Sequence, residues 1–217
     1  MKRAHRRRVG VLAVLIAIAA AILVAAGAAS AITVLEGNLV IEINGATSPK
    51  ALPKDRMAPI SFHGSASVAT RDGSHIPPAL DTQLLIDKHI RIDTTGLPTC
   101  TPGQIQSTTP EGAMKACGAA LIGRGTSTAQ VQFPESTPFT AKGPLLAFNG
   151  PSGGGYGGKG YREQLYYVYA RVPVPTTLIA VGKVSKGTGK YGYKISISIP
   201  KIAGGSGSFS GADFTIN

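Results

Sequence analysis

Apolar and polar residues alternate along much of the chain, and this alternation constrains the possible folds more than any other feature. In residues 191–199 every second residue is tyrosine or isoleucine, and the residues between them are glycine, lysine or serine. The same period of two occurs in residues 39–43, 84–92 and 129–133. Because successive side chains of a strand point to opposite faces of a sheet, these segments are predicted to be strands with one buried face.

Further strand candidates are separated by turn residues. The candidates are residues 60–69, 143–148, 163–172, 176–184 and 212–216. The turn signals are Asn44-Gly45, Asp72-Gly73, Asn149-Gly150 and Gly187-Thr188-Gly189. Glycine (28) and proline (15) are in excess over average composition, which disfavours long helices. The sequence therefore predicts an all-β fold, an antiparallel β-sandwich of eight or nine strands with Greek-key-like connections, with a barrel as the alternative.

One region has helical character. Thr109 is a suitable N-cap, Pro110 suits the first helical position, and Glu111 favours the positive end of the helix dipole. The helix is predicted to stop by Gly123, and a shorter turn is predicted to start at Thr101-Pro102. We therefore expect a helical insertion near residues 101–122 within a single domain that spans residues 32–217.

The chain contains two cysteines, Cys100 and Cys117, and they bracket this insertion. In an exported chain two cysteines most simply form one disulfide, and buried free thiols are the alternative. No histidine lies within ten residues of either cysteine, and the Cys-x-x-Cys spacing of redox catalysts is absent. We therefore expect a structural disulfide, with neither a metal nor a cofactor.

The N-terminus has the three parts of an export signal. Five basic residues lie within residues 2–8, residues 9–26 carry no charged side chain, and Ala29-Ser30-Ala31 offers the small residues of a cleavage site. Residues 1–31 are predicted to be a signal peptide that is cleaved after Ala31. The alternative is an uncleaved anchor that crosses the membrane with residues 9–29. Either way the positive-inside rule places the domain outside, secreted or in the cell envelope.

Positive charge is concentrated in the second half of the domain. The net charge of the whole chain is +11, but residues 32–135 sum to −1 and residues 136–217 sum to +7. The candidate contact residues lie around one predicted hairpin and are Lys183, Lys186, Lys190, Lys194 and Lys201. Anionic wall polymers or lipid headgroups are the expected partners outside the cell. The alternative is that these lysines only keep the sheet edge soluble. A chain without tryptophan and with 6% aromatic residues does not favour a nucleic-acid-binding module.

Two other patterns are weaker candidates for a site. Residues 153–160 match a phosphate-loop pattern in part, but Gly160 occupies the position that requires serine or threonine, so we expect a hairpin loop. Asp87, His89, Arg91 and Asp93 alternate as the outer face of a strand. Because an arginine in this row opposes a metal cation, a solvated face with ion pairs is expected.

Residues 96–125 resemble a segment of exported β-rich proteins of high-GC Gram-positive bacteria. The similar stretches are Gly96-Leu97-Pro98-Thr99-Cys100, Thr109-Pro110-Glu111 with Ala116-Cys117, and Ala120-Leu121-Ile122-Gly123-Arg124-Gly125. The resemblance implies an exported β-rich domain with a disulfide-clamped helical insertion. These proteins have no assigned activity, so the resemblance implies no functional residue.

The sequence favours a secreted or envelope-associated module that acts by binding or by structure and not by catalysis. The first alternative is an extracellular hydrolase whose site is assembled in space from His63, His75 or His89 with carboxylates. The second alternative is a carrier of apolar ligands, which requires a sandwich or barrel interior larger than its own side chains can fill.

Overall fold

The computed structural model describes residues 30–152, 162–171 and 174–217. Residues 1–29, which make up most of the predicted export segment, and the glycine-rich residues 153–160 lie outside the described residues. Within the described part there are ten strands. They are β1 (Ser30–Glu36), β2 (Leu39–Ser48), β3 (Ser61–Thr70), β4 (Asp81–Asp87), β5 (Leu121–Val131), β6 (Phe139–Ser152), β7 (Arg162–Arg171), β8 (Pro175–Lys186), β9 (Tyr191–Ser198) and β10 (Gly207–Ile216).

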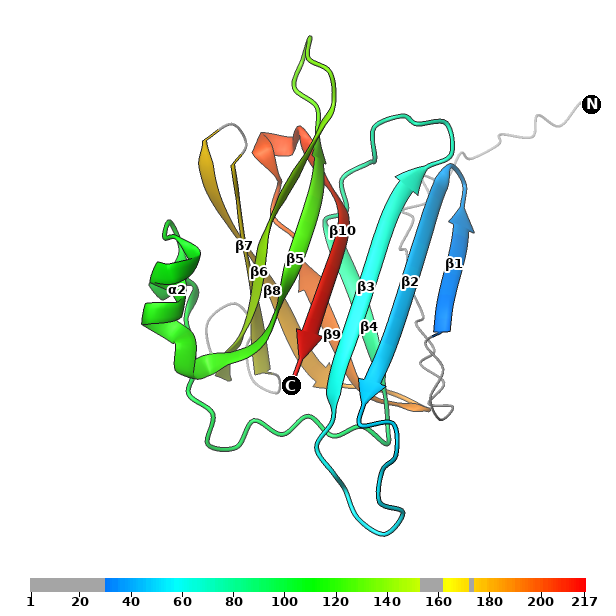
Figure 1. Ribbon diagram of the computed structural model, residues 1–217, viewed down its shortest axis with the longest axis vertical. Helices are drawn as coiled ribbons and strands as arrows, with labels where there is room; N and C mark the ends of the chain where they lie inside the picture. The colour runs from blue at the N-terminus through cyan, green and yellow to red at the C-terminus, as the bar shows by residue number, and fades with distance from the viewer. Residues whose placement is uncertain (1–29, 153–161, 172–173) are drawn as a thin grey trace, which may run out of the picture.

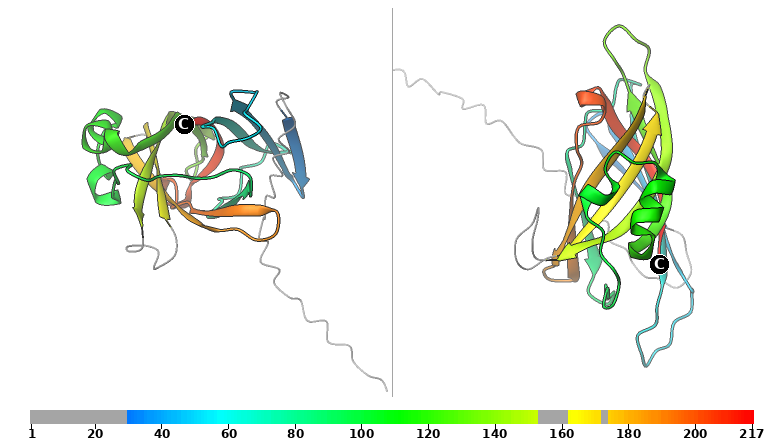
Figure 2. Two further views of the ribbon diagram at one scale, coloured as in Figure 1. Left: turned by 90° about the horizontal axis from the view of Figure 1, so that it is seen from below. Right: turned by 90° about the vertical axis from the view of Figure 1, so that its left-hand side faces the viewer.

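The ten strands form one sheet in which every neighbouring pair is antiparallel. The order is β1-β2-β3-β10-β5-β6-β7-β8-β9-β4, so β10 is inserted between β3 and β5, and β4 forms an edge beside β9. The sheet curls, and its two edges lie on the same side of the molecule (Figures 1 and 2). The predicted antiparallel all-β class is confirmed, with ten strands in place of eight or nine and one curled sheet that forms a half-barrel.

The strand directions define two ends of the half-barrel. We call the end at which β1 begins the lower end, because it lies at the bottom of Figure 1, and the other the upper end. Since neighbouring strands are antiparallel, the loop of residues 49–60 between β2 and β3 and the turn of residues 187–190 between β8 and β9 both lie at the lower end. Residues 88–100, which follow β4, cross this end toward the helical insertion (Figure 1).

The two faces of the sheet hold two apolar cores, because side chains alternate along each strand. The inner face carries small and branched residues that are buried inside the curl: Ile41, Leu145, Ala147, Ala180, Val184 and Ile195. The outer face of β6 and β7 carries Phe148, Leu165 and Tyr167, which are fully buried under the helical insertion. Each core therefore uses every second residue of the same central strands.

The helical insertion consists of α1 (Pro102–Ile105) and α2 (Pro110–Cys117), followed by a 3-10 turn (Gly118–Ala120). As predicted, Thr109 caps α2, since its side chain accepts a hydrogen bond from the Gly112 amide at 3.2 Å. The Tyr167 hydroxyl donates to the carbonyl of Thr108 at 2.5 Å, which ties the start of α2 to β7. The insertion therefore covers the outer face of β6 and β7 as one tied unit (Figure 2).

Three local predictions are wrong, for physical reasons that the structure makes plain. Asn44-Gly45 lies inside β2, where a Cβ on Gly45 would come within 3.2 Å of the Phe62 ring. Asn149-Gly150 lies inside β6 at an irregularity of the ladder to β7. The strand predicted over 84–92 ends at Asp87, because this carboxylate accepts the His89 amide at 2.9 Å and turns the chain.

Candidate functional site

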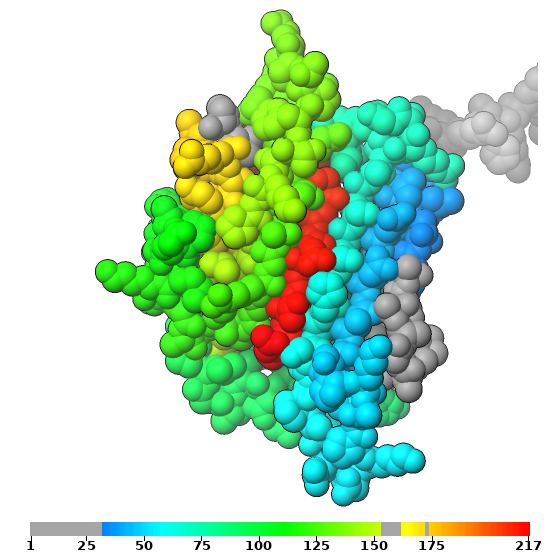
Figure 3. Space-filling model, viewed as in Figure 1, coloured from blue at the N-terminus to red at the C-terminus, as the bar shows by residue number. Residues whose placement is uncertain are grey.

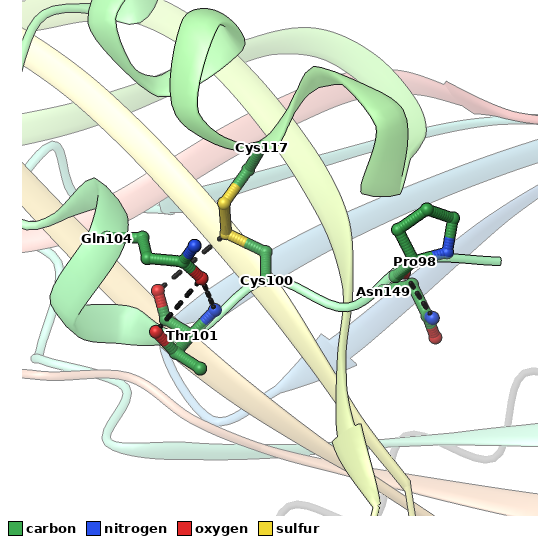
Figure 4. The surroundings of a disulfide bond; sticks show 6 residues. All are labelled: Pro98, Cys100, Thr101, Gln104, Cys117 and Asn149. Carbon is green, nitrogen blue, oxygen red and sulfur yellow. Dashed lines mark hydrogen bonds between the residues drawn. A yellow bond between two sulfur atoms is a disulfide. The ribbon is translucent and has the colours of Figure 1, made fainter.

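The predicted disulfide between Cys100 and Cys117 is present, with the two Cα atoms 5.5 Å apart. Both cysteines are buried in the outer core beside Ile105 and Phe148. The Thr101 amide donates to Gln104 Oε1 at 2.8 Å, which stabilises the turn directly after Cys100 (Figure 4). The disulfide thus joins the end of the crossing segment 88–100 to the end of α2.

Hydrogen bonds from the sheet hold the crossing segment at the lower end. The buried Asn149 side chain of β6 donates to the carbonyl of Pro98 at 2.8 Å (Figure 4). It also donates to the carbonyl of Leu97 at 3.4 Å. The Cys100 amide donates to the Asn149 carbonyl at 2.8 Å, and Arg162 donates to the carbonyl of Thr94 at 3.4 Å. The crossing segment is therefore held to β6 and β7, which are distant from it in sequence.

The structure separates the five candidate lysines into three places. Lys186 and Lys190 are exposed at the lower end, beside the turn between β8 and β9. Lys183 and Lys194 lie on the outer face of β8 and β9, and Lys183 is directly opposite the buried Glu163 of β7. Lys201 follows β9 and is therefore at the upper end. Only Lys186 and Lys190 share the turn that the sequence identified.

Pairing of β4 with β9 brings a further lysine to this turn. The Lys88 amide donates to the carbonyl of Lys190 at 3.1 Å, and the Lys88 side chain is exposed. Sequence reasoning missed Lys88, because only the β4–β9 ladder places it there. Asp87 supplies a counter-charge and bonds to His89 Nδ1 at 2.7 Å. Hydrogen bonds from the His89 amide and ring lower the pKa of Asp87, with a smaller contribution from the charge of Lys88.

The loop of residues 49–60 adds three cations to the lower end. Apart from Arg91, which pairs with Asp93, six exposed basic side chains then lie in the loops and turns of this end: Lys50, Lys54, Arg56, Lys88, Lys186 and Lys190. We call this set the basic end. Asp55 and Asp87 oppose it, while Arg91 and Asp93 pair with each other at 3.2 Å. The upper end is close to balance, with Arg71, Arg171 and Lys201 against Glu36, Asp72, Asp81 and Glu135.

The three histidines of the hydrolase alternative lie in three separate parts of the molecule. His63 is half exposed on the outer face of β3, with Nδ1 3.3 Å from Thr215 Oγ1 and Nε2 3.5 Å from Asp213 Oδ2. His75 lies in the connection between β3 and β4, at the upper end, and His89 lies beside the basic end. Asp87, His89, Arg91 and Asp93 do not form a strand face, because β4 ends at Asp87.

Two further features bear on the predicted localisation. No helix among residues 30–152, 162–171 and 174–217 has the length and apolar character needed to cross a membrane. The predicted cleavage position after Ala31 lies within β1, which begins at Ser30.

Within the same described ranges, no three histidine, cysteine, aspartate or glutamate side chains are grouped so that they could bind a metal ion.

The comparisons with known proteins do not add a relative. No family model, no curated protein and no solved structure matches the chain.

Proposed function

We propose that the protein is exported and acts as a non-catalytic module that binds anionic polymers or lipid headgroups of the cell envelope through the basic end. The observation that carries the proposal is the gathering of six exposed cations at one end of the half-barrel, opposed by two carboxylates. These cations come from three segments that are distant in sequence. Their gathering is therefore a property of the fold, and it concentrates positive potential on one surface.

The energetics of such a contact are electrostatic and depend on salt. A lysine or arginine close to an anionic membrane surface contributes about 1 kcal/mol, and the attraction falls off within a Debye length of about 10 Å at 0.1 M salt. The exposed side chains of the basic end can approach a charged surface to within this distance. Lys201 at the upper end cannot reach the same surface, since β9 alone, with 8 residues, spans about 25 Å.

Two features support a location outside the cytoplasm. A disulfide is typical of oxidising compartments, and the Cys100–Cys117 bond is formed. The basic, apolar and small-residue parts of residues 1–31 favour export as a secreted or envelope-associated protein. If residues 9–29 are retained, the module is anchored in the membrane with the domain outside.

The test uses the full-length chain and two matched triple variants. The lower-end variant carries Lys88→Gln, Lys186→Gln and Lys190→Gln, and the upper-end control carries Arg71→Gln, Arg171→Gln and Lys201→Gln. Binding is measured by co-sedimentation with phosphatidylglycerol vesicles, phosphatidylcholine vesicles and purified cell wall. We expect the lower-end variant to lose affinity for the anionic vesicles by up to about a hundredfold at low salt, and the control to change little.

Both triple variants lower the net charge by three, so a general charge effect would weaken them equally. Equal losses in the two variants would therefore contradict a role for the basic end. Absence of binding to anionic vesicles and to cell wall at low salt would contradict the proposed function as a whole.

A further inference from the structure

The loop between β2 and β3 combines exposed apolar side chains with cations. Leu52 is 45% exposed and Met57 is 66% exposed. Leu35 and Leu80 at the upper end are exposed to a similar degree beside the carboxylates of Glu36 and Asp81, whereas Leu52 and Met57 share a loop with cations. Lys50, Lys54 and Arg56 are exposed in the same loop. The loop projects from the lower end of the molecule beyond the strands that it connects (Figures 1 and 3).

This combination fits the interfacial region of a bilayer better than a hydrophilic polymer. Lysine and arginine keep their charged groups at the headgroups, while their apolar stems and neighbouring apolar side chains enter the acyl boundary. A wall polymer would contact Lys50, Lys54 and Arg56, but it would gain little from Leu52 and Met57. The exposed apolar residues therefore favour lipid as the partner of this loop.

The path of the chain points to the same surface. β1 begins at Ser30 at the lower end, where Ser30 pairs with Gly45 of β2. β2 ends three residues later at Ser48, and the loop of residues 49–60 follows. In the sequence the uncharged apolar segment 9–26 precedes Ser30 by only a few residues. Such a segment enters the membrane during export, so the lower end is the part of the domain that emerges next to the bilayer.

We propose that the loop of residues 49–60 is a membrane-insertion loop that seats the lower end of the half-barrel on an anionic lipid bilayer. Leu52 and Met57 enter the acyl boundary, and Lys50, Lys54 and Arg56 contact the headgroups. This inference rests on the proposed function, because it uses the same basic end. The inference goes beyond the proposed function in two ways. It names a lipid bilayer as the partner, and it requires Leu52 and Met57 to enter the bilayer, which a purely electrostatic contact does not.

The absence of tryptophan from the sequence provides a clean test. In the full-length chain, Met57→Trp creates a single fluorescent reporter in the loop. Val174→Trp creates a control reporter at the upper end, where Val174 is 63% exposed. With phosphatidylglycerol vesicles we expect a blue shift for the loop reporter and quenching by lipids that are brominated on the acyl chain. We expect neither change for the control reporter.

A second variant separates insertion from charge. Leu52→Ser with Met57→Ser keeps every cation, so its binding to soluble polyphosphate should equal that of the unaltered chain. Its affinity for phosphatidylglycerol vesicles should fall by about tenfold, because the apolar contribution is lost. An unchanged affinity for vesicles would overturn the insertion of these two side chains.

The outcomes distinguish this inference from the proposed function. If the loop reporter does not shift while the lower-end lysine variant still loses vesicle binding, the insertion loop is overturned and the electrostatic contact stands. Binding to polyphosphate and cell wall without binding to vesicles would also overturn the inference and leave the proposed function intact. A shifted and quenched loop reporter, together with weaker binding of the double serine variant, would support the inference.

Discussion

The lower and upper ends of the half-barrel are built on the same ten strands but differ in charge and in how their loops are held. At the lower end, six exposed cations lie beside a crossing segment that Asn149 ties to the sheet and the disulfide ties to α2. At the upper end the positive and negative charges nearly balance. The connections of this end are held by hydrogen bonds near the turns. Among these contacts Asn38 donates to Asp72 Oδ1 at 2.8 Å, and the Arg71 amide donates to the Asn38 carbonyl at 2.9 Å.

This difference shows that strand pairing and surface charge are determined by different parts of the sequence. The strands supply a ladder that is the same at both ends, because an antiparallel sheet has no polarity between its ends. The connections decide which end carries charge and which contacts hold it, because loops vary more freely than the strands that they join. The lower end is therefore expected to depend on the disulfide and the buried Asn149, and the turn at Asn38 of the upper end on exposed hydrogen bonds.

The largest expected effect comes from the disulfide that fixes the crossing segment. Cys100→Ser with Cys117→Ser opens a loop closed across a sequence separation of 17, and the chain-entropy estimate for such a loop is about 3 kcal/mol. Chemical denaturation of the full-length chain should show a loss of this size in the free energy of unfolding. Reduction of the unaltered protein is the control and should give a similar loss. An unchanged midpoint would show that the tie does not stabilise the lower end.

The next effect concerns Asn149, which donates to two carbonyls of the crossing segment and is 1% exposed. Asn149→Ala should lower the free energy of unfolding by about 2 kcal/mol, because it removes a buried donor that bonds the carbonyls of Leu97 and Pro98 to β6. Hydrogen exchange should localise the change to residues 94–100. If exchange there were unaltered, the crossing segment would be held by other contacts.

The matched change at the upper end is Asn38→Ala. The Asn38 side chain bonds to Asp72 and Ser74, but all three residues are exposed. Solvent replaces such bonds at little cost, so the loss should be below about 1 kcal/mol in the same denaturation experiment. A loss as large as that of Asn149→Ala would contradict the difference between the two ends.

The smallest effect is a titration at the upper end. Hydrogen bonds from Ser74 and Asn38 lower the pKa of Asp72 from 3.8 to about 2. Because this pKa is depressed by folding, the stabilisation is complete above pH about 4 and is lost as the pH falls toward 2. Carboxyl NMR should find the Asp72 midpoint near pH 2, and Asn38→Ala should move it back toward the ordinary value.

The sequence was sufficient where local chemistry decides the structure. The alternation in residues 191–199 predicted β9, Thr109 and Pro110 predicted the start of α2, and the cysteine pair predicted the disulfide. The strand β1 was missed, because Ser30–Glu36 begins within the expected cleavage site. The end of β4 was misplaced, because alternation continued past the turn at Asp87.

The basic end could be predicted only in part. The sequence grouped Lys186 and Lys190 correctly, since one turn separates them. Lys88 and the loop of residues 49–60 reach the same end through the pairing of β4 with β9 and of β2 with β3. The β4–β9 pairing is non-local, and no property of residues 81–87 alone identifies its partner. The exposure of Leu52 and Met57 in the same loop as three cations is likewise known only from the structure.

The place of β10 in the sheet has a consequence for the order in which the molecule can be assembled. Without Gly207–Ile216 the strand order has a gap between β3 and β5, which leaves three strands on one side and six on the other. The edge strand β4 also pairs only with β9, which follows it by about a hundred residues in the chain. The strands that precede β10 in the chain therefore cannot form the complete sheet by themselves. The complete ten-stranded sheet can therefore close only after residue 216 has been made, and this non-local pairing is of the kind that slows folding.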